Sequence, residues 1–338
     1  MKKILSIIIP TYNMESLLTQ CLNSLLVSKN LDMLEVLVIN DGSTDKSSQI
    51  AHQYEVEYPN SFRVIDKANG NYGSCINAAL PLVNGKYVRI LDADDSYNTE
   101  NLNQFIDFLS DIDVDLVLSD FSHYNMDGKM LSFKKFNLPL NKSFDFLYIP
   151  LGTFLPMHSV TYKSSIFDKI EYHQTDGVSY TDMEWIFYPL SQVNTVCYYN
   201  KEIYRYLVGR DGQTMDFSAI LKRQSHAAKG ILTELNIINK FDSNNKHYAY
   251  LDYWFKFRLK SLYKENLLYK CINFDLKEFD DNLKKNYPQL ANYVNGIKLP
   301  IKHTNLSFPL VKVWRSLGSK KLMSFHPLFL IYKVCNKI

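Results

Sequence analysis

Short continuous runs of apolar residues alternate with runs of helical spacing along the first third of the chain. The first, Ile4–Ile9, is nearly continuous and is typical of a central parallel strand covered on both faces. Leu34–Ile39 is the next expected strand, and Phe62–Ile65 is a short third strand. Pro10 should end the first strand. Apolar residues from Met14 to Leu26 then recur at three- and four-residue intervals, which predicts an amphipathic helix with Asn13 as its N-cap.

The same alternation continues to about residue 120. Ser43 or Asp45 can cap a helix that runs to about Tyr58. After the third strand the expected elements are a loop at 69–73, a helix through Ile76–Val83, a strand at Tyr87–Leu91, a helix near Leu102–Leu109 and a strand at Val114–Ser119. Because βαβ crossovers are right-handed, this order predicts an α/β fold with a Rossmann-like, mostly parallel sheet.

The regular alternation of expected strands and helices ends after Asp120. The expected strands are Lys129–Lys135, Val160–Tyr162, Thr195–Tyr199 and Ile203–Leu207, and the expected helices are one around Asp182, Ile220–Ile238, Tyr248–Tyr269 and Phe279–Tyr293. We therefore predict three parts, namely two halves of one α/β domain over 1–120 and 121–215, and a helical C-terminal extension over 216–338.

Three carboxylates stand within four residues directly after the Tyr87–Leu91 strand: Asp92, Asp94 and Asp95. A continued strand or a tight turn would each aim Asp92 and Asp94 to the same side. Like charges this close repel, so the cluster favours a compensating cation such as Mg²⁺ or Mn²⁺. An acidic turn that caps the following helix is the alternative, and this stretch alone leaves both readings open.

Polar clusters follow three of the predicted strands, at Thr11–Asn13, Asp41–Asp45 and Asp92–Asp95. Ligands of parallel sheets bind at the carboxyl ends of the strands, and these clusters share that edge. Acidic turns placed at random would not gather there. The convergence is the strongest purely physical indication of a binding site.

Composition and charge limit the classes of protein. With 46% hydrophobic and 22% charged residues the chain is of the soluble globular type, and its five scattered cysteines have no Cys-x-x-Cys spacing, which fits reduced thiols rather than a zinc site. No run of about 18 apolar residues is present. The net charge is +3, and the span 300–338 contains basic residues but no acid. A nucleic-acid role would need a basic face on the main domain, whereas only the tail is basic.

Several motifs, taken together and in order, resemble family 2 glycosyltransferases of the GT-A fold, inverting enzymes common in bacterial polysaccharide synthesis. The matching pieces are Ser6–Asn13, Val38–Asp45, Asn69–Ser74 with Asn77, Leu91–Asp95 as the DxD motif, and Thr181–Trp185 as the acidic motif. The resemblance covers roughly the first two-thirds of the chain, and the helical C-terminal region lies outside it.

The resemblance implies that residues 1–120 bind a nucleotide-sugar, usually a UDP-sugar. The residues implied at that site are Pro10, Thr11, Tyr12, Asn13, Asp41, Asn69, Gly70, Asp92, Ala93, Asp94 and Arg210. Asp41 would bond the edge of the base, although the same position also suits a turn before a helix. Arg210 belongs to a loop similar to one that closes over the donor and would reach the diphosphate; a solvated turn is the alternative.

The resemblance also assigns the metal and the chemistry. Asp94, with Asp92, would hold Mn²⁺ or Mg²⁺, while Asp95 would be a helix cap or an outer carboxylate. Asp182 would be the general base that deprotonates the acceptor. The family usually has Glu before this Asp, where Thr181 stands here, and Glu184 is a weaker candidate for the base.

Residues 121–215 would bind the acceptor, with His158, Thr181 and Trp185 as the implied contacts. A lone histidine is as often structural. Trp185 could stack on a sugar, but a large aromatic residue on an amphipathic helix is at least as often part of the core. Tyr72 leaves the same choice between stacking and packing.

Together these features imply an inverting, metal-dependent hexosyl- or N-acetylhexosaminyltransferase. It would act on a glycan, lipid-linked or glycoprotein acceptor in bacterial surface polysaccharide or glycan synthesis. The alternatives are a non-catalytic carbohydrate-binding or scaffold protein on the same fold, and a sugar nucleotidyltransferase. The last predicts a basic, glycine-rich loop after the first strand, where Pro10–Asn13 stand instead.

The implied location is cytoplasmic. The tail mixes lysines with apolar residues such as Trp314 and Phe325, which suits peripheral contact with the inner face of the plasma membrane. The alternative is that the tail is a last helical layer that packs its apolar residues.

Overall fold

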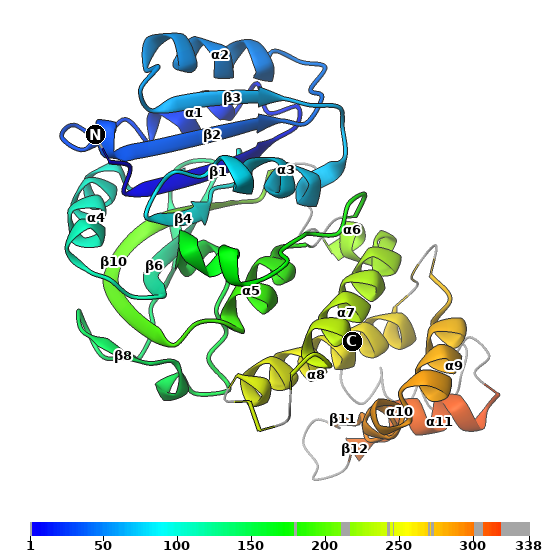
Figure 1. Ribbon diagram of the computed structural model, residues 1–338. Coiled ribbons are helices and arrows are strands. Elements are labelled where there is room, and N and C mark those ends of the chain that lie inside the picture. The colour runs from blue at the N-terminus through cyan, green and yellow to red at the C-terminus, as the bar shows by residue number, and fades with distance from the viewer. Residues whose placement is uncertain are drawn as a thin grey trace. The chain divides into compact units, whose positions relative to one another are not determined.

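The computed structural model describes residues 2–178, 181–210, 217–241, 244–245, 247–269, 271, 274–300 and 307–318. The chain divides into two compact units. Unit 1 comprises Met1–Gln213 and Asn236–Leu251, and unit 2 comprises Thr214–Leu235 and Asp252–Ile338. Unit 1 carries the large sheet and unit 2 is mostly helical (Figure 1).

Among the described residues of unit 1, ten strands form one mixed sheet. The strands are β1 Leu5–Thr11, β2 Leu34–Asn40, β3 Phe62–Asp66, β4 Tyr87–Ile90, β5 Ser96–Tyr97, β6 Leu116–Asn125, β7 Met130–Lys134, β8 Ser143–Asp145, β9 Val160–Lys163 and β10 Thr195–Val208. Their order is β3-β2-β1-β4-β9-β6-β10-β5, with β7 beside β6 and β8 beside β10. The first four strands run parallel, as do β6 and β10, and β9 lies antiparallel between β4 and β6. This confirms the predicted, mostly parallel α/β fold.

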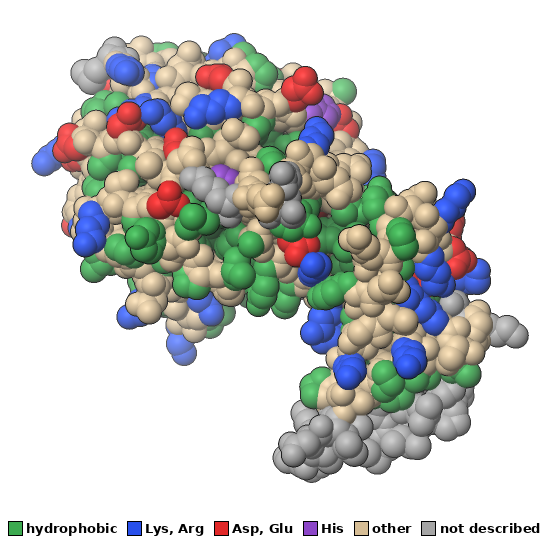
Figure 2. Space-filling model, turned by 60° about the horizontal axis from the view of Figure 1, so that its bottom comes forward, with side chains coloured by type: hydrophobic (Ala, Val, Ile, Leu, Met, Phe, Trp, Pro, Cys, Tyr) green, Lys and Arg blue, Asp and Glu red, His purple; other side chains and the backbone are tan. Residues whose placement is uncertain are grey.

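The helices of unit 1 flank this sheet (Figure 1). They are α1 Leu18–Asn23, α2 Ser47–Glu57, α3 Asn71–Ala79, α4 Thr99–Asp111 and α5 Asp182–Leu190. All seven residues of β2 are buried, as expected for a strand covered on both faces. Helix α4 buries Leu102, Phe105, Ile106 and Leu109 in the same core as β1. In Figure 2, hydrophobic side chains remain visible over part of the surface of unit 1.

Two local predictions near β1 are wrong. The strand continues through Pro10 to Thr11, because its partner β2 also extends, and Thr11 pairs with Asn40. Asn13 does not cap a helix; it adopts a positive φ of 52°, and its Oδ1 accepts a hydrogen bond from the backbone N–H of Thr44 at 2.8 Å. Helix α1 begins only at Leu18, and Leu17 at its N-cap offers no side-chain hydrogen bond.

The two strands predicted at 195–199 and 203–207 are one strand, β10. Polar residues separate the two predicted ranges, but the strand passes through them with a shift in its pairing with β6 between Tyr199 and Tyr204. Glu202 is buried there, and its Oε2 accepts hydrogen bonds from Asn98 and Arg205 at 3.0 and 3.1 Å. These hydrogen bonds satisfy the buried carboxylate, so the strand can continue through the polar stretch.

The C-terminal region is helical, as predicted. Its elements are α6 Phe217–Lys222, α7 Gln224–Ile238, α8 Tyr248–Leu268, α9 Leu276–Asn286, α10 Pro288–Asn295, α11 Leu310–Ser316 and the short pair β11 Leu299–Pro300 and β12 Ser307–Phe308. Two helices predicted as continuous are each divided in two. One of the divisions falls at Tyr287, where Pro288 occupies the first turn of α10 and favours a new helix start.

The described part of the tail packs within unit 2. Trp314 is buried, and the guanidinium of Arg315 donates hydrogen bonds to Asp280 at 2.5 and 3.1 Å. This favours the packing alternative for α11, whereas Phe325 and the rest of the predicted membrane contact lie outside the described residues. Within the described ranges, no helix combines the length and apolar character needed to cross a bilayer.

Candidate active site

The acid cluster forms a turn at the end of β4. The backbone N–H of Asp95 donates to the carbonyl of Asp92 at 3.0 Å, so the chain turns rather than continuing as a strand. The following helix, α4, is capped by Asn98, whose side chain accepts from the N–H of Asn101. The cluster therefore does not cap the helix, and that alternative is excluded.

Asp92 is held in place by a tyrosine from α3. The hydroxyl of Tyr72 donates to Asp92 Oδ1 at 2.8 Å, which gives this ring a role as a positioning residue rather than as a stacking platform. Burial, and then the charge of Asp94, raise the pKa of Asp92 to about 7. Asp182 is also near enough for its charge to act in the same direction. The turn thus holds more negative charge than its surroundings neutralise.

Asp95 faces inward and is fully engaged. The hydroxyl of Tyr204 donates to Asp95 Oδ2 at 2.5 Å, and the backbone N–H of Leu207 donates to Oδ1 at 2.7 Å. Burial, followed by the charges of Asp94 and Asp92, raises the pKa of Asp95 well above its usual range. These bonds tie the turn to β10, which fits the prediction of an outer carboxylate and not that of a helix cap.

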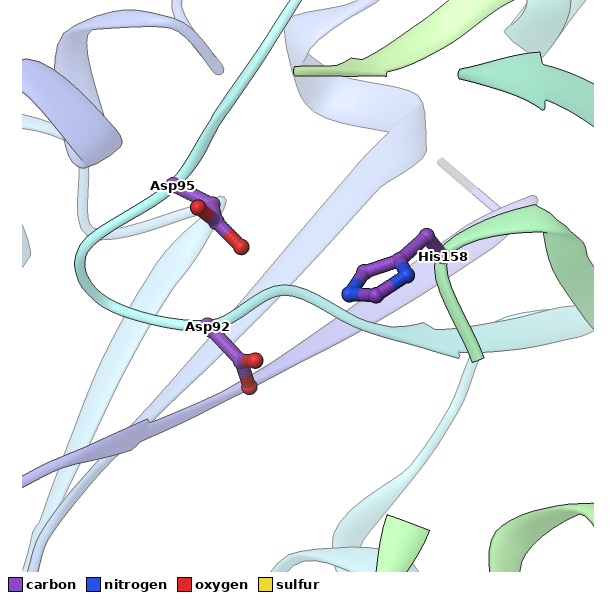
Figure 3. Close-up of side chains that lie close together, drawn as sticks. All are labelled: Asp92, Asp95 and His158. Atoms are coloured by element: carbon purple, nitrogen blue, oxygen red, sulfur yellow. The ribbon is translucent and has the colours of Figure 1, made fainter. Parts of the chain in front are cut away.

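His158 lies beside the same turn. Ligand atoms of Asp92, Asp95 and His158 all lie within 4.8 Å of one another (Figure 3). The imidazole contacts the rings of Phe121, Tyr204 and Tyr206, with centroids 4.7 to 5.5 Å away. Burial lowers the pKa of His158 to about 3, so its ring is neutral at physiological pH.

The carboxylate of Asp94 is paired with a guanidinium. Arg210 Nε donates to Asp94 Oδ2 at 2.6 Å, and both side chains are largely buried. Arg210 follows β10 at the start of the loop predicted to close over the donor, whose residues 211–214 lie outside the described ranges. The structure therefore brings together two residues that the sequence assigned to the same diphosphate site.

The predicted nucleotide side is a network of loop contacts. The backbone N–H of Asp41 donates to the carbonyl of Thr11 at 2.8 Å, and that of Asn13 donates to Ser43 Oγ at 3.1 Å. Thr11 is buried, whereas Tyr12 is 48% exposed at the edge of the sheet. Hydrogen bonds thus connect the loop after β1 to the loop after β2. Tyr12 belongs to the loop after β1, and its ring is accessible to solvent.

Asp41 links β2 to the loop before α3. Its Oδ1 accepts from Lys67 Nζ at 2.7 Å and from the backbone N–H of Gly70 at 2.9 Å, and Asn69 Nδ2 donates to its carbonyl at 2.9 Å. A Cβ on Gly70 would lie 2.6 Å from Ser74 Oγ, so the close approach requires glycine. Lys67 was not singled out in the sequence, although its position one residue past β3 is a signal that could have found it.

The acidic motif begins helix α5. Asp182 is its first residue, and its charge acts on Asp92 and on the hydroxyl of Tyr72, which places it beside the carboxylate turn. Glu184 is buried, and its Oε2 accepts from the backbone N–H of Thr175 at 2.7 Å. Glu184 therefore holds a loop, and Asp182 is the carboxylate of this motif that reaches the site.

Trp185 and Thr181 do not offer the acceptor surfaces that were predicted. Trp185 is fully buried against Phe167, Tyr162 and Tyr172, with ring centroids 5.0 to 5.9 Å apart. Thr181 is also buried. The apolar face of α5 packs into the core, so the core alternative for Trp185 is the one that the structure supports.

The residues of this turn fit a divalent cation. Asp92, Asp95 and the neutral imidazole of His158 bring ligand atoms within 4.8 Å of one another, and the charges of Asp94 and Asp182 act on Asp92. Oxygen-rich sets of this kind suit Mg²⁺ or Mn²⁺. Burial first, and then the charge of Asp94, raise the pKa of Asp92, and a cation would offset both effects. Asp94 and Asp92 would hold the ion, since both oxygens of Asp95 already accept hydrogen bonds.

Comparison with known proteins agrees with the fold. The sequence model described as Glycosyl transferase family 2 matches residues 6–171. An uncharacterized glycosyltransferase of Mycoplasma pneumoniae, the MG060 homolog, is 31% identical over 233 residues, which cover 65% of this chain and 74% of that protein. The chain belongs to glycosyl transferase family 2.

Two further proteins extend the comparison. A poly(ribitol-phosphate) beta-glucosyltransferase of Bacillus spizizenii is 32% identical over 127 residues, which cover 37% of this chain and 20% of that protein. The crystal structure of S. aureus TarS 1–349 in complex with UDP-GlcNAc superposes with a TM-score of 0.63 at 20% identity, covering 87% of this chain and 81% of that one. The fold is therefore GT-A, the fold that the motifs predicted.

Proposed function

We propose that the protein is an inverting, metal-dependent glycosyltransferase that moves a hexose or N-acetylhexosamine from a UDP-sugar to a growing surface glycan. The observation that carries this proposal is the meeting of the Asp92–Asp95 turn with Asp182 at one sheet edge. One set of carboxylates suits the diphosphate with its metal, and a separate carboxylate suits the acceptor.

The donor would lie on residues 1–120. Pro10–Asn13, Asp41, Asn69 and Gly70 would line the nucleotide, and the Asp92-Ala93-Asp94 turn with Arg210 would hold the diphosphate. The hydrogen bond between Thr11 and Asp41 supports this arrangement, because both residues lie at the carboxyl ends of the parallel strands β1 and β2. The UDP-GlcNAc bound to TarS, a protein of the same fold, supports a UDP-sugar as the donor.

The acceptor would lie on residues 121–215, next to Asp182. Asp182 takes the proton of an acceptor hydroxyl as that oxygen bonds to the anomeric carbon, and the bond from that carbon to the diphosphate breaks on the opposite face. The electron pair of the broken bond leaves with UDP. A bound Mn²⁺ or Mg²⁺ would supply neutralisation of the diphosphate charge. This single displacement inverts the anomeric centre.

The acceptor would be a glycan, a lipid-linked saccharide or a glycoprotein of a bacterial surface. The poly(ribitol-phosphate) beta-glucosyltransferase among the relatives supports a surface polysaccharide. UDP-sugars are made in the cytoplasm, so the reaction would take place there or at the inner face of the membrane. His158 would contribute to the site from the acceptor side, through its neutral ring.

The test is a screen of nucleotide-sugars for hydrolysis and transfer, with Mn²⁺ or Mg²⁺ and with a chelator. Release of UDP should require the metal, and it should be lost in Asp94→Ala and Asp182→Asn. Asp168→Asn changes an exposed carboxylate elsewhere in unit 1 and is the matched control. If the folded protein neither binds nor turns over any donor in the presence of metal, the proposal is wrong.

A further inference from the structure

The β6–β7 hairpin exposes apolar side chains that the sheet does not need. Met126, Met130, Leu131 and Phe133 are 45 to 56% exposed, and they stand within eight consecutive positions. The inner side of β7 is held by Ser132, which hydrogen-bonds the imidazole of His123 at 2.7 Å. The outward residues therefore project from a strand that is already anchored to β6.

The turn of this hairpin is well defined. The backbone N–H groups of Gly128 and Lys129 donate to the carbonyl and the side chain of Asn125 at 3.0 and 2.8 Å, and Gly128 has a φ of 73°. Such a turn requires little ordering when the hairpin meets a surface. The exposed residues therefore belong to a hairpin whose turn is already hydrogen-bonded.

Lysines accompany the apolar residues. Lys129, Lys134 and Lys135 are exposed, and no ion pair joins any of them to a carboxylate among the described residues. From Lys129 to Phe144 the sequence has four lysines and no Asp or Glu. The hairpin itself, Met126–Lys135, has three lysines and one acid, Asp127, so it is cationic as well as apolar.

This combination differs from that of an ordinary edge strand. Edge strands use lysine to prevent pairing with other chains, but they do not gain from exposed Leu, Phe and Met. Contiguous exposed apolar residues mark interaction surfaces, and apolar residues mixed with lysines are typical of segments that lie on anionic bilayers. A soluble polyanion would match the lysines and leave the apolar side chains in water.

The hairpin also starts at the candidate site. Asn125, Met126 and Gly128 line a cavity of about 180 Å³ whose wall includes Asp94. Apolar exposure continues in the chain after the hairpin, at Leu140, Leu147, Tyr148 and Leu151.

We propose that the β6–β7 hairpin, Met126–Lys135, docks on the surface of an anionic phospholipid bilayer. Met130, Leu131 and Phe133 enter the interfacial region, and Lys129, Lys134 and Lys135 pair with lipid headgroups. The surface is formed by residues of unit 1. Docking is measured without substrate, so it succeeds or fails independently of the proposed function.

The experiment is flotation of the full-length protein with vesicles of equal parts phosphatidylcholine and phosphatidylglycerol, and with vesicles of phosphatidylcholine alone. The wild type should float with the anionic vesicles only. Lys134→Gln with Lys135→Gln should weaken binding about twentyfold, and Leu131→Ser with Phe133→Ser about tenfold or more. Raising the salt concentration should weaken the wild type further.

Matched controls lie elsewhere in unit 1. Val56→Ser removes an apolar side chain that is 81% exposed, and Lys46→Gln with Lys169→Gln removes two exposed lysines. Both should bind as the wild type does. Binding unchanged in both hairpin variants overturns the proposal, as does concentration-dependent self-association through Leu131 and Phe133 without vesicle binding. Binding to soluble polyphosphate would be measured in place of vesicle binding. If both hairpin variants lost affinity for polyphosphate to the same extent as for vesicles, the proposal would also be contradicted.

Discussion

Arg210 Nε donates a hydrogen bond to Asp94 Oδ2 at 2.6 Å, across 116 positions of the sequence. Asp94 is also the carboxylate proposed to hold the metal. The guanidinium and the metal therefore compete for the same carboxylate. When a metal and donor bind, Arg210 would be released toward the diphosphate, whose charge it can pair with.

Replacing Arg210 with Gln should separate these two roles. Without the guanidinium, Mn²⁺ should bind to the donor-free protein about three- to tenfold more tightly, since a partly buried ion pair no longer has to be broken. Turnover should fall about 10- to 100-fold because the diphosphate loses a positive partner. Isothermal titration with Mn²⁺ and steady-state rates measure the two effects. Arg63→Gln, on an exposed residue of β3, is the control, and weaker Mn²⁺ binding by Arg210→Gln would refute the competition.

The Tyr72–Asp92 hydrogen bond predicts a pH dependence of metal binding. The metal needs the Asp92 carboxylate deprotonated, and its pKa is raised to about 7, so affinity should decline as the pH falls through that value. The hydroxyl of Tyr72 lowers this pKa, and therefore Tyr72→Phe should move the decline to higher pH, by up to about one unit. Mn²⁺ titrations between about pH 5.5 and 8.5 would measure the shift. A profile of Tyr72→Phe that overlays those of the wild type and of Tyr58→Phe would contradict this role.

Trp185 should matter for stability and not for the acceptor. Trp185→Ala removes a buried indole packed on Phe167, and it should lower the free energy of unfolding by about 3–5 kcal/mol. Trp185→Phe keeps part of that packing and should leave the acceptor KM unchanged. Tyr148→Ala, at a ring that is 71% exposed, should cost no more than about 0.5 kcal/mol. Urea unfolding measures the first effect, and a raised acceptor KM in folded Trp185→Phe would restore the stacking role.

Local patterns were sufficient for much of the fold. The apolar runs that became β1 and β2 are buried on both faces, so hydrophobicity alone marks them. The third run became the edge strand β3, in which Phe62 is buried and Arg63 is exposed. The turn after β4 could be found because its three carboxylates are adjacent in sequence. The sequence assigned Asn13 as a helix cap, but its side chain accepts a hydrogen bond from the backbone of Thr44 instead. Thr44 lies in the loop after β2, so the partner is distant in the sequence.

The supports of the site could not be predicted, because they join distant parts of the chain. Tyr204 reaches Asp95 across 109 positions, and Arg210 reaches Asp94 across 116. A single sequence with many tyrosines does not indicate which hydroxyl faces a carboxylate. The burial of Trp185 likewise depends on Phe167 and Tyr172, which belong to other elements.

The most direct test of the account is to measure donor binding and turnover in the same preparation of Asp182→Asn. With Mn²⁺ present, the variant should bind the UDP-sugar as tightly as the wild type, while transfer falls about 10²- to 10⁴-fold because no carboxylate takes the acceptor proton. Asp94→Ala should instead lose donor binding together with turnover. Normal transfer by Asp182→Asn, or undiminished metal-dependent donor binding by Asp94→Ala, would contradict the central claim that these two carboxylates serve opposite sides of one displacement.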